Sequence, residues 1–266
     1  MKVGIAGYGT IGQALAAKLQ DCDLPLELVA INSRDAEKAQ SEASSLKTVP
    51  QAVSINELVR QCDVIVDCAP TAAFEQIATE TLTAGKVLVT VNGAALLQHP
   101  EIEGLAKDSG GRVVLATGAL LGLDAVRAAA LGTIYSVDMI TRKPPTSLVK
   151  AEYVVKNAID LTALDKPLKI FSGSASEGAA AFPANVNVAA ALGLAGIGPD
   201  RTRLEIWADP ALERNTHNII VDADSARLEL KIENVPTDEN PGTGKITALS
   251  ILAALRALVS PIHIGS

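Results

Sequence analysis

The first 120 residues alternate short apolar segments with longer amphipathic ones. The apolar segments are nearly continuous, which is typical of parallel strands buried on both faces. They predict strands at residues 2–7, 26–31, 62–70, 86–91 and 111–117. The amphipathic segments predict helices at residues 10–20, 35–46, 72–85 and 101–110. Because strand and helix alternate repeatedly, this part of the chain is expected to form a Rossmann-type, doubly wound parallel sheet with right-handed crossovers.

After about residue 120 the pattern changes to longer strands with period-two alternation. The alternation is clearest in residues 225–235, where the apolar side chains on one face are Leu228, Leu230 and Ile232. A sheet with one covered and one wet face is typical of antiparallel architecture. Residues 121–242 are therefore predicted to form a second α+β domain with a largely antiparallel sheet. The apolar helix at 243–260 is expected to pack back on the first domain, residues 1–120.

The chain of 266 residues carries a formal net charge of −7 and has no long basic run. This charge argues against a nucleic-acid or anionic-membrane partner. The longest uncharged stretch, residues 178–199, is interrupted by Pro183, Asn185 and Asn187. We interpret it as a buried helix of a soluble protein rather than as a membrane span.

The N-terminus begins directly as a strand with glycines and lacks the charged and apolar regions of a signal peptide. Cys22, Cys62 and Cys68 form no metal-ligand or CxxC spacing, and their odd number does not suggest a disulfide framework. We therefore expect a cytoplasmic protein with free thiols and no bound metal.

A glycine-rich segment joins the first predicted strand to the first helix. Gly7, Gly9 and Gly12 fit the pattern G-x-G-x-x-G, and Thr10 and Ile11 open the helix. Gly7 permits a tight turn, Gly9 lets the backbone approach a pyrophosphate, and Gly12 allows close packing of helix on strand. The helix N-terminus adds N–H donors and positive potential. These five residues predict a dinucleotide site; an ordinary tight turn is the alternative, and the strand–helix context argues against it.

Asn32, Ser33 and Arg34 follow the second predicted strand, where an acidic residue favours NAD by accepting from the ribose 2′-hydroxyl. The first carboxylate comes only at Asp35. Because Arg34 can pair with a 2′-phosphate, the sequence leaves both NAD and NADP open as the cofactor. In the other interpretation, Asn32 and Ser33 only turn the chain and Arg34 is solvated.

Two loops of small residues follow strands, at the carboxyl ends where ligands bind in doubly wound sheets. Ala69 and Pro70 can admit the nicotinamide side of the cofactor, although Pro70 equally suits a strand-to-helix turn. Ala119 lies in the second loop and can lie against the nicotinamide. A plain helix-entry loop at that place needs no ligand.

Two later segments carry polar groups beside apolar helices. Asn185 and Asn187 open a helix, where an amide either caps the helix or holds the nicotinamide carboxamide. Thr243, Gly244 and Lys245 form a turn before the last helix. Free N–H groups beside a lysine make a candidate site for a substrate carboxylate, and a capped terminal helix is the other interpretation.

His217 is the candidate acid–base group. It alternates with Ile219 and Val221 on a strand of the second domain, while His99 and His263 lie in a loop and in the C-terminal tail. A histidine on an apolar strand face is commonly structural. A dehydrogenase, however, needs a group that manages the substrate proton, and histidine titrates near neutral pH.

With these features assembled, the sequence resembles the L-aspartate dehydrogenase family over nearly its full length. The resemblance is strongest in "GIAGYGTIG", "ATGALLGLDA" and "RNTHNI", and over residues 173–196 and 240–258. It implies NAD(P)-dependent oxidation of L-aspartate to iminoaspartate, which yields oxaloacetate and ammonia or enters NAD biosynthesis. It also implies that His217 is the active-site histidine and that Ala119 and Asn185 contact the cofactor. The second domain is then expected to bind the substrate and to form a homodimer.

Two alternatives remain open at this point. One is a related two-domain NAD(P)-dependent reductase acting on another small dicarboxylate or on dihydrodipicolinate, although the paired-histidine motif of the latter family is absent from the sequence. The other is a non-catalytic NAD(P)-sensing protein. Turnover of L-aspartate separates both from an aspartate dehydrogenase.

Overall fold

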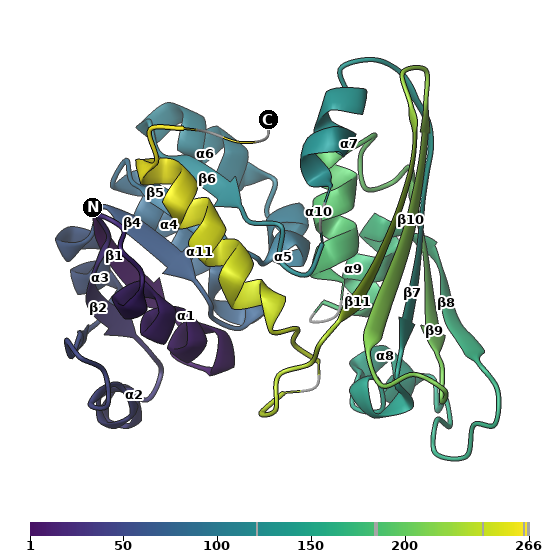
Figure 1. The fold of residues 1–266 in the computed structure, drawn as a ribbon, viewed down its shortest axis with the longest axis horizontal. Coiled ribbons are helices and arrows are strands. Elements are labelled where there is room, and N and C mark those ends of the chain that lie inside the picture. Colours follow the sequence, from purple (N-terminus) through teal and green to yellow (C-terminus); the bar gives the residue numbers. More distant parts are fainter. Residues whose placement is uncertain (121, 184–185, 241, 263, 265–266) are drawn as a thin grey trace. The chain divides into compact units, whose positions relative to one another are not determined.

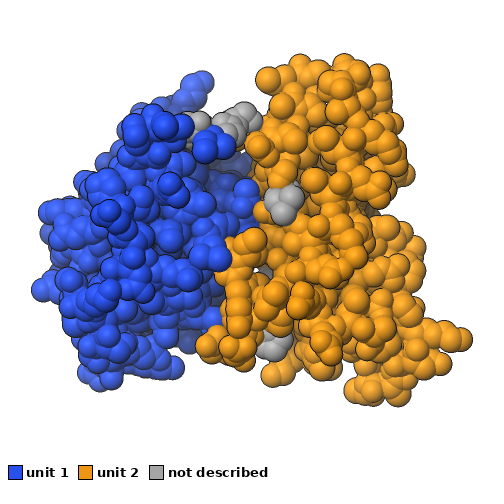
Figure 2. Space-filling model, viewed as in Figure 1, with its two compact units in different colours: residues 1–118, 247–264 blue, residues 119–246, 265–266 orange. Residues whose placement is uncertain are grey.

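The computed structural model describes residues 1–120, 122–183, 186–240, 242–262 and 264. Its chain divides into two compact units (Figures 1 and 2). Unit 1 contains residues 1–118 and 247–264, and unit 2 contains residues 119–246. Each unit has its own sheet and its own helices.

Unit 1 is built on a six-stranded sheet in the order β3-β2-β1-β4-β5-β6, with all neighbours parallel. Its strands are β1 (Lys2–Ala6), β2 (Glu27–Asn32), β3 (Gln51–Ala52), β4 (Val64–Asp67), β5 (Val87–Thr90) and β6 (Arg112–Leu115). Every residue of β4 is buried, as the uninterrupted apolar pattern predicts. The Rossmann-type doubly wound sheet expected from the sequence is confirmed.

Helices cover this sheet. They are α1 (Thr10–Asp21), α2 (Ala36–Ala43), α3 (Ile55–Gln61), α4 (Phe74–Thr83), α5 (Gly93–Gln98), α6 (Glu101–Ser109) and α11 (Ile246–Val259), with a 3₁₀ turn η1 (Thr71–Ala73) before α4. Helix α11 comes from the other end of the chain, yet Ala248, Ile251 and Leu255 share a core with Val3 and Ile5 of β1. Its apolar face therefore completes the core of unit 1.

The segment between α2 and β4 contains two elements that the apolar pattern does not predict. Strand β3 has only two residues and pairs in parallel with β2 at the edge of the sheet. Helix α3 has seven residues and begins with a capping box, in which the Ser54 hydroxyl accepts from the Glu57 N–H and the Glu57 carboxylate accepts from the Ser54 N–H. The spacing S-x-x-E was the available signal for this helix.

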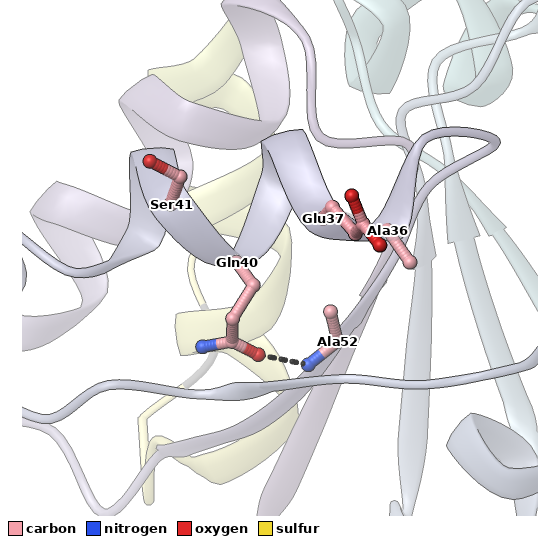
Figure 3. A pocket seen from close by; sticks show the side chains of 5 residues that line it. All are labelled: Ala36, Glu37, Gln40, Ser41 and Ala52. Atoms are coloured by element: carbon pink, nitrogen blue, oxygen red, sulfur yellow. Dashed lines mark hydrogen bonds between the residues drawn. The ribbon is translucent and has the colours of Figure 1, made fainter.

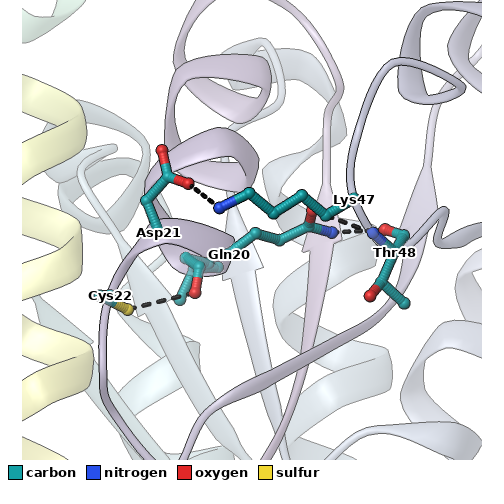
Figure 4. A network of polar contacts seen from close by, with 6 residues as sticks. Gln20, Asp21, Cys22, Lys47 and Thr48 are labelled. Carbon is teal, nitrogen blue, oxygen red and sulfur yellow. Dashed lines mark hydrogen bonds and ion pairs between the residues drawn. The ribbon is translucent and has the colours of Figure 1, made fainter.

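A polar network ties the loop before β3 to the end of α1 (Figure 4). The Gln20 amide bonds both the carbonyl and the N–H of Thr48, and Lys47 forms an ion pair of 2.7 Å with Asp21. The Cys22 thiol donates to the Leu19 carbonyl. The loop is thus fixed to α1 by polar bonds, in addition to the packing of Leu46 against the core of unit 1.

Unit 2 is built on a five-stranded sheet in the order β11-β10-β7-β9-β8, in which β7 and β9 are parallel and the other neighbours antiparallel. Its strands are β7 (Ile134–Lys143), β8 (Leu168–Ser174), β9 (Thr202–Ala208), β10 (Asn215–Ala223) and β11 (Arg227–Asn234). Burial alternates along β11 as predicted, with Arg227, Glu229 and Lys231 exposed. The α+β domain with a largely antiparallel sheet is confirmed.

The helices of unit 2 are α7 (Leu123–Ala129), α8 (Glu152–Lys156), α9 (Ala175–Ala181) and α10 (Asn187–Ala195), with a 3₁₀ turn η2 (Pro145–Ser147). The stretch 178–199, expected to be one buried helix, belongs to two: α9 ends at Ala181 and α10 begins at Asn187. Pro183 lies between them and cannot donate a helical N–H. Within the described residues, no helix has the length and apolar character needed to cross a membrane.

Candidate functional site

The glycine-rich loop has the geometry that a dinucleotide requires. Gly7 has φ +95°, and a Cβ there would lie 2.4 Å from the Ala69 nitrogen. A Cβ on Gly12 would lie 2.2 Å from the Gly7 carbonyl oxygen, so helix α1 packs directly on the loop. By contrast, a Cβ on Gly9 would meet no atom within 4 Å. Gly9 is also the N-cap of α1 and offers no capping side chain, which leaves the first N–H groups of the helix for a ligand.

The two glycines give a matched pair of variants. We expect Gly12→Ala to destabilise the protein by about 1–3 kcal/mol, because a methyl group forced into a packed contact moves backbone. Gly9→Ala should leave the thermal unfolding midpoint unchanged but weaken NADH and NADPH binding by roughly tenfold or more, because the methyl fills the approach of the pyrophosphate. Thermal unfolding and fluorescence titration of the reduced cofactors measure the two effects. Unchanged affinity in Gly9→Ala would exclude this loop as the pyrophosphate site.

Ala69 lies beside the glycine-rich loop, as its close approach to Gly7 shows. The loop that carries Ala69 and Pro70 is held by Asp67 at the end of β4, whose carboxylate accepts from the Ala69 N–H at 3.0 Å and from the Thr90 hydroxyl at 2.8 Å. Burial raises the pKa of Asp67 to about 6, and the two hydrogen bonds oppose the shift. Pro70 precedes the turn η1. The structure therefore brings the glycine loop and the Ala69–Pro70 loop together at the carboxyl ends of β1 and β4.

Residues 32–35, which are expected to meet the adenosine ribose, contain one carboxylate, and that carboxylate caps a helix. The Asn32 amide donates to the Val53 carbonyl at 2.8 Å, and the Asp35 carboxylate caps α2 by accepting from the Lys38 N–H at 3.0 Å. Ser33 is half-buried and Arg34 is exposed. Asn32 therefore fixes the edge of the sheet, and Arg34 is the residue of this segment that can meet a 2′-phosphate.

A shallow cavity of about 450 Å³ lies beside this segment, between α2 and β3 (Figure 3). It is lined by Ala36, Glu37, Gln40, Ser41 and Ala52. The Gln40 side-chain oxygen already accepts from the Ala52 N–H at 2.8 Å. The lining includes neither the glycine-rich loop nor His217, so this cavity is not the catalytic centre.

In unit 2, polar residues occupy one end of the covered face of the sheet. His217 of β10 pairs with Thr141 of β7 on one side and with Ile232 of β11 on the other. In the next row, Asn215 pairs with Asn234. Continuing the register beyond the Thr216–Arg142 pair places Lys143 across from Asn215.

Every polar residue of these two rows is buried; their exposed fractions are 3% for Thr141, 4% for Lys143, 7% for Asn215, 4% for His217 and 5% for Asn234. Further along β10, Ile219 and Val221 continue the same face and are fully buried. The predicted alternation of His217 with these two aliphatic residues is therefore confirmed. His217 lies where the apolar part of the face meets the polar part.

The imidazole of His217 is held as a neutral base. Its Nδ1 lies 3.0 Å from the Thr141 hydroxyl. Burial, and second the charge of Lys143, lower the pKa of His217 to about 3. If Nδ1 carries the proton and donates to Thr141, Nε2 presents a lone pair, which is the form that accepts a proton from water.

Sequence reasoning missed Lys143, Asn215 and Asn234. Lys143 ends a strand in which Val137, Met139 and Thr141 alternate on the covered face, and this period-two pattern was the available signal. Burial lowers the pKa of Lys143 to about 8. Since a buried ammonium is costly, its place beside a catalytic candidate is itself informative.

Ala119 and Gly244 are brought together by Asn234. The Asn234 amide donates to the Ala119 carbonyl at 3.2 Å, and a Cβ on Gly244 would lie 3.4 Å from the Asn234 Cβ. The predicted cofactor residue Asn185 lies outside the described residues, and Asn187 is the first residue of α10.

The expected carboxylate site at Thr243–Lys245 has fewer free donors than predicted. The N–H of Thr243 donates to the Asn240 carbonyl and that of Lys245 to the Val235 carbonyl. The Lys245 ammonium lies 3.3 Å from the Asp238 carboxylate, with both side chains largely exposed. Substrate binding at Thr243, Gly244 and Lys245 stays a prediction.

One group of possible metal ligands occurs among the described residues, formed by Glu75, His99 and Glu101. His99 already lies 2.8 Å from Glu101, and both glutamates are exposed. Exposed acidic groups commonly gather without an ion, so this cluster alone does not indicate a metal site.

Comparisons with known proteins agree with this geometry. Residues 124–258 match the family described as "Aspartate dehydrogenase, C-terminal", and residues 7–116 match "Homoserine dehydrogenase, NAD binding domain". The chain is 47% identical to an L-aspartate dehydrogenase of Bradyrhizobium diazoefficiens, over 100% of this chain and 94% of the relative. It is 46% identical to "L-aspartate dehydrogenase 3" of Bordetella bronchiseptica, over 99% of this chain and 97% of the relative.

Solved structures show the same fold. The crystal structure of aspartate dehydrogenase from Thermotoga maritima matches with a TM-score of 0.75 and 26% identity, covering 100% of this chain and 99% of that one. An archaeal homoserine dehydrogenase in complex with NADPH matches with a TM-score of 0.60 and 15% identity, covering 98% of both chains. The second likeness concerns the fold alone.

Proposed function

Because the chain belongs to the aspartate dehydrogenase family, we propose that it oxidises L-aspartate with NAD or NADP. The product is iminoaspartate, which yields oxaloacetate and ammonia or enters NAD biosynthesis. The observation that carries the proposal is His217, a buried neutral imidazole at the polar end of the covered sheet face, in a chain that also has an open dinucleotide loop.

The residues of unit 1 fit a dinucleotide. Gly9 leaves the space that a pyrophosphate needs, and the N-terminus of α1 supplies N–H donors and positive potential. The Asp67 carboxylate accepts a hydrogen bond from the Ala69 N–H and so fixes the loop beside the glycine-rich segment. A bound nicotinamide would supply the hydride acceptor for the substrate Cα, and loss of that hydride would convert the amine to an iminium group.

His217 then acts as the acid–base group in the hydrolysis of the iminium group. Neutral Nε2 accepts a proton from the water that attacks the iminium carbon, and the imidazolium returns that proton to the nitrogen as ammonia departs. Thr141 holds the ring by its bond to Nδ1. Ile219, the next residue on the same face of β10, is fully buried, so this side of the imidazole borders an apolar part of the sheet face. The hydride carries both electrons of the oxidation. As the C–N bond breaks and the carbonyl forms, the imidazole takes up the remaining hydroxyl proton and releases it to solvent.

Arg34 should set the use of NADP. We expect Arg34→Ala to raise the Kd of NADPH about 10- to 100-fold while the Kd of NADH changes little, because a charge-assisted bond to the 2′-phosphate is lost. Fluorescence titration of both reduced cofactors checks this. Lys38→Ala, an exposed cation of α2 paired with Glu42, is the charge-matched control. An equal loss of affinity for both cofactors would contradict a 2′-phosphate contact.

The proposal is tested by absorbance of the reduced nicotinamide, with NAD and with NADP, across L-aspartate, malate, homoserine and a panel of amino acids. L-aspartate is expected to be the substrate. Preferred turnover of malate or homoserine would favour a related dehydrogenase of the same fold. Cofactor binding without turnover of any compound would favour an NAD(P)-sensing protein.

We also propose a homodimer through the outer face of the unit 2 sheet. Ile140, Trp207 and Ile220 lie half-buried on that face, opposite the covered rows. The cytoplasmic location expected from the sequence stays a prediction.

A further inference from the structure

Four polar residues form one connected chain of hydrogen bonds at the carboxyl ends of β4 and β5. The Asp67 carboxylate accepts from the Thr90 hydroxyl at 2.8 Å, and the Thr90 oxygen accepts from the Asn92 N–H at 2.9 Å. The Thr71 hydroxyl donates to the Asn92 side-chain oxygen at 3.4 Å. The bonds therefore leave β4 at Asp67 and return to the same loop at Thr71, so residues 68–70 lie between two fixed points.

The backbone of this loop lies against the glycine-rich segment. The Cys68 N–H donates to the Ala6 carbonyl at the end of β1, at 2.7 Å. The Ala69 N–H donates to the Asp67 carboxylate at 3.0 Å, and a Cβ added to Gly7 would lie 2.4 Å from the same nitrogen. Asp67 thus fixes a backbone N–H that lies directly against the turn of the proposed dinucleotide site.

The two oxygens of Asp67 are both acceptors in this arrangement. Oδ1 accepts from the Ala69 N–H and Oδ2 from the Thr90 hydroxyl. An ionised carboxylate has only acceptor oxygens, whereas a carboxylic acid turns one of them into a donor. A proton on Oδ1 would compete with the Ala69 N–H, and a proton on Oδ2 would force the Thr90 hydrogen to turn away. The ionised group is therefore the form that fits these bonds.

Asp67 nevertheless lies where ionisation is costly, since it is only 1% exposed. Its partners in the sheet, Ala6 and Thr90, carry no charge. The helices on this face, α3 and α4, contribute the apolar side chains Leu58, Phe74 and Ile77. Burial raises the pKa of Asp67 to about 6, and no charged side chain of the described residues contributes to that shift. The neighbouring Cys68 stays a thiol, because burial, and second the charge of Asp67, raise its pKa.

We propose that Asp67 is a positioning residue of the cofactor site, whose ionised carboxylate holds the loop at residues 68–71 in the form that binds the dinucleotide. A proton on Asp67 releases the Ala69 N–H or the Thr90 hydroxyl, and the loop loses one of its fixed points. Cofactor affinity then falls in mild acid. This inference rests on the proposed NAD(P) site and adds its control by protons.

Calorimetric titration with NAD and with NADP, both stable in acid, measures the effect at pH 7.5 and pH 5.5. If only the ionised form binds, an Asp67 pKa of about 6 raises the wild-type Kd about fourfold over this window, because affinity scales with the competent fraction. Asp67→Asn has the same shape and cannot ionise. It should bind about tenfold more weakly at pH 7.5 and lack this rise. Groups that titrate elsewhere, on protein or cofactor, are the same in both proteins.

Thr90 gives a second set of variants, which leave the carboxylate in place. The bond from its hydroxyl lowers the pKa of Asp67, so Thr90→Val should raise that pKa, and the Kd should begin to rise at a higher pH. Thr90→Ser should restore the wild-type profile. Thr81→Val is the control, because Thr81 is also fully buried but its hydroxyl donates to the Ile77 carbonyl within α4. This control should keep the wild-type profile.

The same ratio of Kd at the two pH values in the wild type and in folded Asp67→Asn would overturn the role of Asp67. A Thr90→Val profile identical to that of the wild type would do the same. Thermal unfolding shows whether each variant is folded, and the Thr90 variants decide the question if Asp67→Asn is not. A wild-type protein that binds neither cofactor is a different result, because it contradicts the proposed function as well.

Discussion

His217→Asn is expected to lower kcat/KM for L-aspartate by about 10²- to 10⁴-fold, the range that general acid–base catalysis contributes. An amide keeps a hydrogen-bonding group opposite Thr141 but cannot take up and return a proton near neutral pH. Because the variant leaves the glycine-rich loop and the Ala69–Pro70 loop unchanged, the Kd of NADH should change little. Initial rates at varied L-aspartate and fluorescence titration of NADH measure the two quantities.

The control for this variant is the next residue of the same strand. Asn218 points to the opposite face of the sheet, away from His217, so Asn218→Ala should keep wild-type kcat/KM once size-exclusion chromatography shows the same oligomer as the wild type. A folded His217→Asn protein with wild-type kcat/KM would remove His217 from the mechanism.

The second large effect concerns stability in acid. Between pH 6.5 and pH 4, the free energy of unfolding of the wild-type protein should fall by about 3 kcal/mol more than that of His217→Asn. Burial, with the charge of Lys143, lowers the pKa of His217 to about 3. Over this window the unfolded chain therefore binds a proton that the native protein excludes. Acidification then favours the unfolded state, and the contribution of His217 is fully recovered above its unfolded pKa.

Asp67 works in the opposite direction. Burial raises its pKa to about 6, so the native protein binds more protons than the unfolded chain between the ordinary carboxyl pKa and this value. Its contribution to stability is present at low pH and is lost as the pH rises. Since Asp67 is unchanged in His217→Asn, the difference between the two proteins isolates the histidine. Urea unfolding at pH 6.5 and pH 4 gives the measurement; parallel losses in both proteins would mean that His217 is not held neutral by the fold.

Much of unit 1 follows from local sequence. Uninterrupted apolar runs such as Val64–Val66 have no polar face to place in water, so they predict strands covered on both sides. Gly7 and Gly12 take the turn and the close packing that their spacing predicts, because both are decided within one strand–helix connection. The approach of a pyrophosphate at Gly9 stays a prediction. Strand β3 has two residues and takes its place only by pairing with β2, which no local pattern reveals.

The candidate site in unit 2 was less predictable. His217 could be found because it interrupts an apolar alternation within its own strand. His217 and Thr141 are far apart in the chain, and only the register of β7 on β10 makes them neighbours. Likewise, Ala119 and Gly244 come close to each other because both contact Asn234, a residue of the last strand, β11. Local patterns predict the faces of strands, whereas register decides which residues meet.

The most direct test of the account is the fate of the hydrogen on the substrate Cα. The enzyme is incubated with L-aspartate deuterated at that carbon and with NAD or NADP, and the reduced cofactor is analysed by mass spectrometry. The account predicts that the reduced cofactor carries the deuterium, in equal amount with oxaloacetate and ammonia. Reduced cofactor without deuterium, or no reduction in the presence of L-aspartate, would contradict it.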